Sequence, residues 1–259
     1  MTSFTFGGTA LTSFGKVTII NDYLDMPERR GDNQLIPYKH GTVFTQKYYD
    51  QRAITLGIAM NAASGSALES TFDNMRKLFS PRAEQVLAMT MEDSTVRNAY
   101  ASVNKSIQVD RRSDKVALVV VEFDLSSPFW KLSTPIADNT VTVNASPKAW
   151  TVTNPGTVQE TDPTITLVGP LTNPVITNTT NSVSLTYAGA IAAGGTILIG
   201  STNGEYYATL GGTASVIGNV THSGNAALMV FEPGANTLSI TSSVTTTGTV
   251  KASFYAPFL

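Results

Sequence analysis

Few side chains in this sequence are spaced for metal binding. The chain has 259 residues, no cysteine and two histidines, His40 and His222, one in each half. Protein zinc sites use several His, Cys or carboxylate ligands at short spacing, and neither histidine has such neighbours in the sequence. The absence of cysteine excludes disulfides and thiolate ligands. We therefore expect no metal and no cofactor.

The pattern of nucleophiles and carboxylates also argues against catalysis. Ser64 stands in Ala-Ser-Gly, not in the G-x-S-x-G sequence of a nucleophile elbow, and is interpreted as a turn residue. Glu92 and Asp93 are adjacent at an expected strand end, so their side chains diverge, unlike the facing carboxylates of a glycosidase. No phosphate-binding glycine motif is present. We predict a protein that is not an enzyme, although a Ser-His-Asp triad is recognised only by its geometry.

Charge is distributed unevenly along the chain. Residues 1–131 contain 15 Lys/Arg and 14 Asp/Glu, whereas residues 132–259 contain 2 and 5. The net charge of −2 argues against a nucleic-acid-binding protein, which usually has a basic surface. The different surface chemistry of the halves predicts two domains, residues 1–131 and 132–259, and favours assembly over catalysis.

The sequence shows no membrane segment. No run approaches the roughly 18 apolar residues that a spanning helix needs. Residues 1–20 contain one lysine and no sustained apolar stretch, so we expect no signal peptide. These patterns predict a protein that is made in a cytoplasm and does not insert into a membrane.

The first domain is predicted to be a β-domain with one helix. Residues 52–60 alternate apolar and small residues, as a half-buried strand does. Residues 116–125 are apolar on both faces at their start, which indicates a central strand covered on both sides. The helix is expected over residues 66–79, where one face is apolar (Leu68, Phe72, Met75 and Leu78). Ser66 and Glu69 match a capping box.

The second domain repeats short β-rich runs bounded by Gly, Pro or Asn. About nine such runs predict an antiparallel sandwich of the jelly-roll type. Asn203-Gly204 between two of them is a strong signal of a two-residue hairpin. Trp150, Tyr206 and Tyr207 are candidates for a sugar-stacking platform, with a place in the core or at a subunit contact as the alternative.

The order of the motifs resembles the distal tail (Dit) proteins of long-tailed bacteriophages over essentially the whole chain. The resemblance lies in strands and turns: Phe4-x-Phe6-x-Gly8, Ile36-Pro37-x-x-His40-Gly41, Arg52-x-Ile54-x-Leu56, Ser127-Pro128-Phe129-Trp130, Pro163-x-Ile165-x-Leu167-x-Gly169, Asn173-Pro174 and Pro233-Gly234-x-Asn236. One departure is Ser127, where the family more often has an acid.

The resemblance implies a structural protein of the virion. It implies a tail-tube-like N-terminal β-sandwich or barrel with one helix, which forms a hexameric ring, and a peripheral galectin-like jelly-roll domain. The ring would join the tail tube to the tip-hub or baseplate proteins, with a receptor-binding protein as a further candidate partner. DNA would pass through the central channel without specific binding. The alternative is a carbohydrate-binding module of a phage tail that contacts the host cell envelope.

In a closed ring, one face of a subunit meets a different face of its neighbour. Mixed charge on exposed segments suits such a contact. Residues 25–40 and the expected hairpin tip at 110–115 are therefore the predicted ring contacts. The candidate interface residues are Glu28, Arg29, Arg30, Asp32, His40, Arg111 and Arg112.

Overall fold

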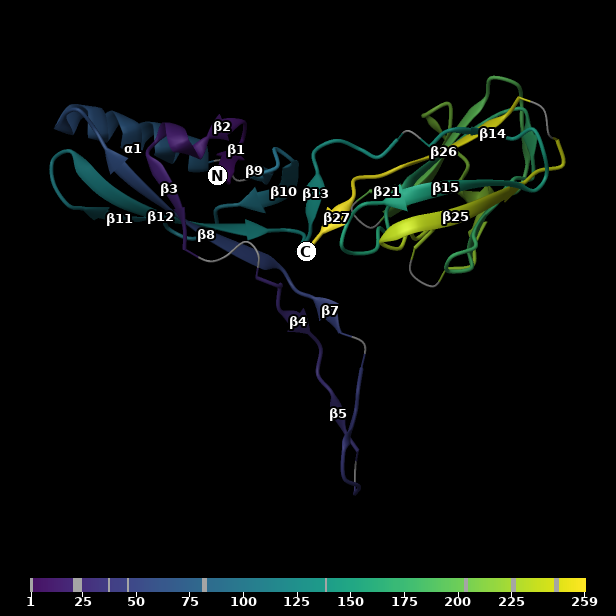
Figure 1. Ribbon diagram of the computed structural model, residues 1–259, viewed down its shortest axis with the longest axis horizontal. Helices are drawn as coiled ribbons and strands as arrows, with labels where there is room; N and C mark the ends of the chain where they lie inside the picture. Colours follow the sequence, from purple (N-terminus) through teal and green to yellow (C-terminus); the bar gives the residue numbers. More distant parts are fainter. Residues whose placement is uncertain are drawn as a thin grey trace. The chain divides into compact units, whose positions relative to one another are not determined.

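The structure is a computed structural model that describes residues 2–20, 25–36, 38–45, 47–80, 83–137, 139–202, 205–224, 227–244 and 247–259. The chain divides into two compact units, Met1–Ser133 together with Leu259, and Thr134–Phe258. Both are built from antiparallel sheets, and the described residues contain one α-helix (Figure 1). The predicted mainly-β fold class is confirmed. No helix in this part of the chain is long and apolar enough to cross a membrane.

The first unit contains one large sheet. Its strands are β1 (Ser3–Phe6), β2 (Thr9–Ala10), β3 (Lys16–Ile19), β8 (Arg52–Asn61), β9 (Gln85–Thr90), β10 (Val96–Ser102), β11 (Gln108–Arg111), β12 (Val116–Leu125) and β13 (Trp130–Leu132). They follow the order β2-β1-β9-β10-β12-β8-β3, with β11 beside β12 and β13 beside β10. A 3-10 turn, η1 (Leu11–Ser13), connects β2 to β3. β8 and β12 pair over ten residues each and form the centre of the sheet.

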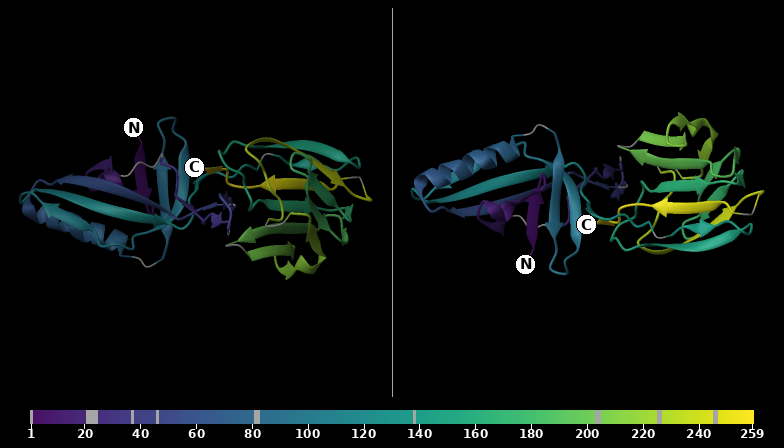
Figure 2. Two further views of the ribbon diagram at one scale, coloured as in Figure 1. Left: turned by 90° about the horizontal axis from the view of Figure 1, so that it is seen from below. Right: turned by 90° about the horizontal axis from the view of Figure 1, so that it is seen from above.

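The helix α1 (Gly65–Phe79) covers one face of this sheet. Figure 2 shows it in front of the sheet from one side and behind it from the other. Phe79 packs against Phe6 and Phe123, with ring centroids 5.7 and 5.8 Å away. The opposite face of β12 is only partly buried. The expectation that residues 116–125 are covered on both sides is therefore wrong, because a single helix covers the sheet.

The predicted helix exists, but its predicted cap is wrong. Ser64 has extended backbone angles, and its hydroxyl accepts a hydrogen bond from the Ala67 amide at 3.2 Å. The capping box therefore does not form at Ser66, which already lies in the first turn. Ser64, which we interpreted as a turn residue, is the residue that satisfies a free amide of the first turn.

A long hairpin, which we call the arm (residues 25–50), projects from the end of the sheet (Figure 1). It consists of two short ribbons, β4 (Arg29–Arg30) with β7 (Tyr48–Tyr49), and β5 (Gln34–Leu35) with β6 (Thr42–Val43). Residues 25–36 and 38–40, which fall in the predicted ring contact, thus belong to a two-stranded ribbon.

The second unit contains two sheets that face each other. Its strands are β14 (Val141–Thr142), β15 (Lys148–Asn154), β16 (Thr164–Val168), β17 (Leu171–Thr172), β18 (Val175–Asn178), β19 (Val183–Tyr187), β20 (Ala190–Ile191), β21 (Thr196–Thr202), β22 (Glu205–Leu210), β23 (Ala214–Ser215), β24 (Val220–His222), β25 (Gly234–Thr241), β26 (Thr249–Ser253) and β27 (Pro257–Phe258), with the 3-10 turn η2 (Ile217–Asn219).

The sheets of the second unit have the orders β14-β26-β16-β21-β22-β23 and β15-β25-β18-β19-β24, and β17 pairs with β20. Alternate residues of each are buried, for example Leu167 on β16 and Leu238 on β25. This is the period-two burial of an antiparallel sandwich. Thr202 pairs with Glu205, and the predicted hairpin turn at 203–204 between them lies outside the described residues.

Candidate interaction surfaces

The described residues contain no group of three or more His, Cys, Asp or Glu side chains that would hold a metal ion. His40 lies on the arm, and His222 lies on β24, so the two histidines belong to different units. Asp93 has a structural role: its carboxylate accepts a hydrogen bond from the Thr95 amide at 2.9 Å. The hydrogen bonds from Thr95 lower the pKa of Asp93.

The base of the arm is fixed by aromatic contacts. Arg29 lies over the ring of Tyr49, with its guanidinium carbon 5.1 Å from the centroid, and donates a hydrogen bond to the Tyr49 hydroxyl at 3.1 Å. Tyr49 meets Phe129 edge to face at 5.8 Å. The predicted interface residue Arg29 therefore has a partner within its own chain, while Glu28, Arg30 and Asp32 are exposed beside it.

The tip of the arm exposes apolar side chains. Leu35 and Phe44 are 80% and 82% exposed, and Tyr38 is fully exposed. Tyr38 has a φ of 60°, in the left-handed region that non-glycine residues rarely adopt. The Ile36 amide donates to the Gly41 carbonyl at 3.3 Å and closes the turn. Among the predicted residues, His40 belongs to this tip, and it is exposed.

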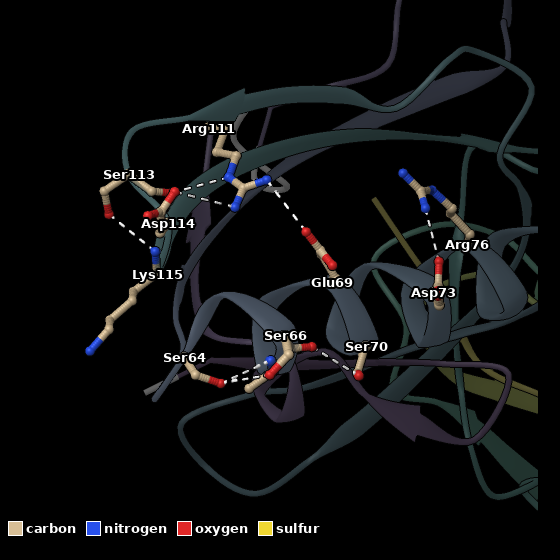
Figure 3. Close-up of polar contacts among 11 residues, drawn as sticks. Ser64, Ser66, Glu69, Ser70, Asp73, Arg76, Arg111, Ser113, Asp114 and Lys115 are labelled. Carbon is tan, nitrogen blue, oxygen red and sulfur yellow. Dashed lines mark hydrogen bonds and ion pairs between the residues drawn. The ribbon is translucent and has the colours of Figure 1, made fainter.

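A groove lies between α1 and β11. Its cavity volume is about 480 Å³, and its lining consists of Glu69, Phe72, Asp73, Arg76, Val109 and Arg111. Figure 3 shows Arg111 reaching from β11 toward Glu69 and Asp114, and Asp73 paired with Arg76 on the helix. The second predicted arginine of this region, Arg112, pairs with Asp110 at 2.7 Å.

The sheet face opposite α1 is open and carries small, apolar and charged side chains, among them Lys16 of β3 and Leu118 of β12, which both pair with Ala59. Thr55 pairs with Glu122 across β8 and β12, and Ala53 pairs with Asp124. Lys105 donates a hydrogen bond to Glu122. This hydrogen bond and the carboxylate charge raise the pKa of Lys105. The positive charge of Lys105 is therefore balanced by a neighbouring acid.

The three candidate sugar-stacking aromatics do not form one platform. Trp150 lies on β15, at one edge of the five-stranded sheet. Tyr206 contacts His222 on β24, the opposite edge, with ring centroids 6.1 Å apart. The Tyr207 hydroxyl lies 3.3 Å from that of Thr164. The Tyr207 side chain thus reaches from β22 past β21 to β16 within the six-stranded sheet. The three rings occupy separate places.

Comparisons with known proteins identify relatives of this chain. Residues 12–125 match the family model of the phage tail protein RIFT-related domain. No curated protein matches the sequence significantly. The crystal structure of SPP1 Dit protein, described as a paradigm of the hub adsorption apparatus in Gram-positive infecting phages, is similar over 100% of both chains, with a TM-score of 0.72 and 14% identity.

Two structures of the phage P2 baseplate in its activated conformation, one with Ca and one with Sr, also contain similar chains. Their TM-scores are 0.51 and 0.50, each with 9% identity and coverage of 100% of both chains. At these identities, the three likenesses show a shared fold.

Proposed function

We propose that this chain, whose residues 12–125 match the phage tail protein RIFT-related domain, is a distal tail protein. It would form a hexameric ring between the tail tube and the tip or baseplate. The observation that carries this proposal is the likeness in fold to a phage hub protein over the full length of both chains. The protein is then a virion component at the tail tip, made in the host cytoplasm, and its role involves no catalytic step.

The first unit supports ring formation because it exposes two different surfaces. One is the arm, with Glu28, Arg30, Asp32 and His40 along it. The other is the α1–β11 surface with Arg111 and Arg112. A contact between unlike surfaces is heterologous and produces a closed ring when its rotation closes. Mixed charges on both sides fix the register of such a contact.

The open sheet face supports a channel for DNA. Lys or Arg on a channel wall would bind phosphate and retard the duplex. The face opposite α1 carries the acids Glu122 and Asp124 together with the cations Lys16 and Lys105, and Lys105 is paired with Glu122. A wall of this composition allows DNA to pass without specific binding.

The second unit has few charges, and we assign it to contacts with other tail proteins at the periphery of the ring. Its partners are then tip-hub proteins and a receptor-binding protein, while the ring itself meets the tail tube. Host-glycan binding, the alternative function, receives no support from the separated positions of Trp150 and Tyr206.

Negative-stain imaging of the purified full chain tests the proposal. Class averages are expected to show a ring with sixfold symmetry and a central opening. A uniform population of single subunits at tens of micromolar would overturn it.

A further inference from the structure

We infer that the arm tip of one copy inserts into the α1–β11 groove of the next, with Tyr38 as the anchor. This inference rests on the proposed ring and specifies which two surfaces meet. The occupant of the groove is therefore a second copy of this chain.

The tip has the character of an anchor. A fully exposed tyrosine at positive φ is energetically unfavourable in an isolated chain. Leu35 and Phe44 extend the same exposed apolar surface along the ribbon. Aromatic residues are the commonest hot spots of interfaces, because they bury a large area for few rotatable bonds. The tip therefore has more apolar surface than a solvated turn requires.

The groove offers an apolar contact to this tip. Phe72 and Val109 provide an apolar lining, and Val109 is 49% exposed in the isolated chain. Its volume of about 480 Å³ falls in the range of pockets that enclose a ligand group. The tip thus offers an aromatic side chain to a cavity in which the apolar side chain of Val109 is exposed to solvent.

The groove places two exposed carboxylates where the cations of the tip can meet them, beside two arginines. Lys39 and His40 follow Tyr38 in the turn and are exposed. Glu69 and Asp73 line the groove with their side chains 69% and 75% exposed, although each is paired on one side with an arginine. Arg76 already lies over the Phe72 ring, at 5.9 Å, and an inserted tyrosine would offer a second aromatic face to these guanidinium groups.

The tip and the groove lie at different places on the first unit. The arm leaves the sheet where β8 begins, whereas the N-terminus of α1 and the β11–β12 turn lie at the other end of β8 (Figure 1). In the proposed ring, the tip of each copy enters the groove of the next, so that the copies join head to tail and close when the rotation between them closes.

Cysteine cross-linking tests the inference, because the natural chain has no cysteine. The double variant Tyr38→Cys with Val109→Cys is oxidised in the assembled state and analysed on a non-reducing gel. We expect a ladder of covalent species up to six chains. The matched control, Lys47→Cys with Val109→Cys, places the first cysteine on the arm away from the tip and is expected to show no ladder.

A charge exchange provides a second readout that does not depend on oxidation. Lys39→Glu and Asp73→Lys are each expected to weaken subunit association about tenfold in sedimentation velocity, and their combination is expected to restore it to within about threefold. Lys47→Glu, with the same change of charge, is the control and is expected to leave association unchanged.

The outcomes separate the inference from the proposed function. An intact ring without a ladder, or with cross-linked dimers only, would overturn tip insertion and leave the ring in place. A wild-type chain that never forms a ring would overturn both. A ladder together with restoration by the exchanged charges would support the inference.

Discussion

Arg111 on β11 places its Nη1 atom 3.8 Å from Oε1 of Glu69 on α1, so that a single ion pair connects the edge strand to the helix. The same arginine lies 3.6 Å from Asp114 in the following turn. Its side chain is 44% exposed and lines the groove. An exposed pair of this kind contributes little to folding, so its position at the groove matters more for assembly than for stability.

Replacement of Arg111 by glutamate is therefore expected to separate assembly from stability. Arg111→Glu should change the free energy of unfolding by less than about 1 kcal/mol, while repulsion from Glu69 and Asp114 disturbs the groove and weakens subunit association. Thermal melting and sedimentation velocity measure the two effects. Lys77→Glu, on the same helix but outside the groove, is the control. Equal effects of both variants on association would contradict the prediction.

Loss of the helix cap is expected to lower the stability of the first unit, in contrast to the replacement of Arg111. Ser64→Ala removes the acceptor of the Ala67 amide and is expected to destabilise the first unit by about 1 kcal/mol. Ser70→Ala, an exposed serine on the same helix, should cost less than about 0.5 kcal/mol. Urea unfolding followed by circular dichroism compares the two. A larger loss for Ser70→Ala would argue against Ser64 as the cap.

The second unit depends on a buried amide pair. The side chain of Asn178 donates to Oδ1 of Asn236 at 3.1 Å, and both residues are fully buried. Asn236 also binds the backbone of Glu232 through its amide and carbonyl groups. Its removal leaves several buried polar groups without partners, each of which costs about 1–3 kcal/mol.

Asn236→Ala is accordingly expected to destabilise the second unit by at least about 3 kcal/mol. Thr237→Ala, at the next and exposed position of β25, should stay within about 0.5 kcal/mol of the wild type. Chemical denaturation of the full chain provides the comparison. A small effect of Asn236→Ala would show that the hydrogen bonds of this asparagine are dispensable.

The open sheet face is expected to make no stable complex with DNA. The wild-type chain should not retard duplex DNA in a gel at physiological salt, because Glu122 and Asp124 on this face offset its cations Lys16 and Lys105. Thr55→Lys with Ala59→Lys adds two cations per copy to this face and should produce salt-sensitive retardation. Strong retardation by the wild type would contradict the role assigned to this face.

Much of the first unit was predictable from local patterns. The 3.6-residue spacing of Leu68, Phe72 and Met75 predicts α1, and all three are buried. Alternation predicts β8. The order of turns and strands resembles that of Dit proteins, and the chain shares the fold of a solved Dit protein. The position of the cap was not predictable from spacing alone, because Ser64 and Ser66 are both plausible caps and Glu69 pairs with a distant arginine.

Of the candidate interface residues, only His40 lies at the arm tip, and the exposed apolar side chains of the tip were not among the candidates. Most of the candidates on the arm are charged residues within 25–34, near its base, where Arg29 has a partner within the chain. Tyr38, Leu35 and Phe44 become conspicuous only through their exposure, which depends on the whole fold. The available signal was a cluster of large apolar residues around a turn, and such a cluster is equally typical of a buried hairpin.

The mass of the assembled full chain tests the central claim most directly. One chain has a mass of 27.5 kDa, so sedimentation equilibrium of the purified protein at tens of micromolar should give six times this value. A single species at the mass of one chain over the whole concentration range would contradict the account.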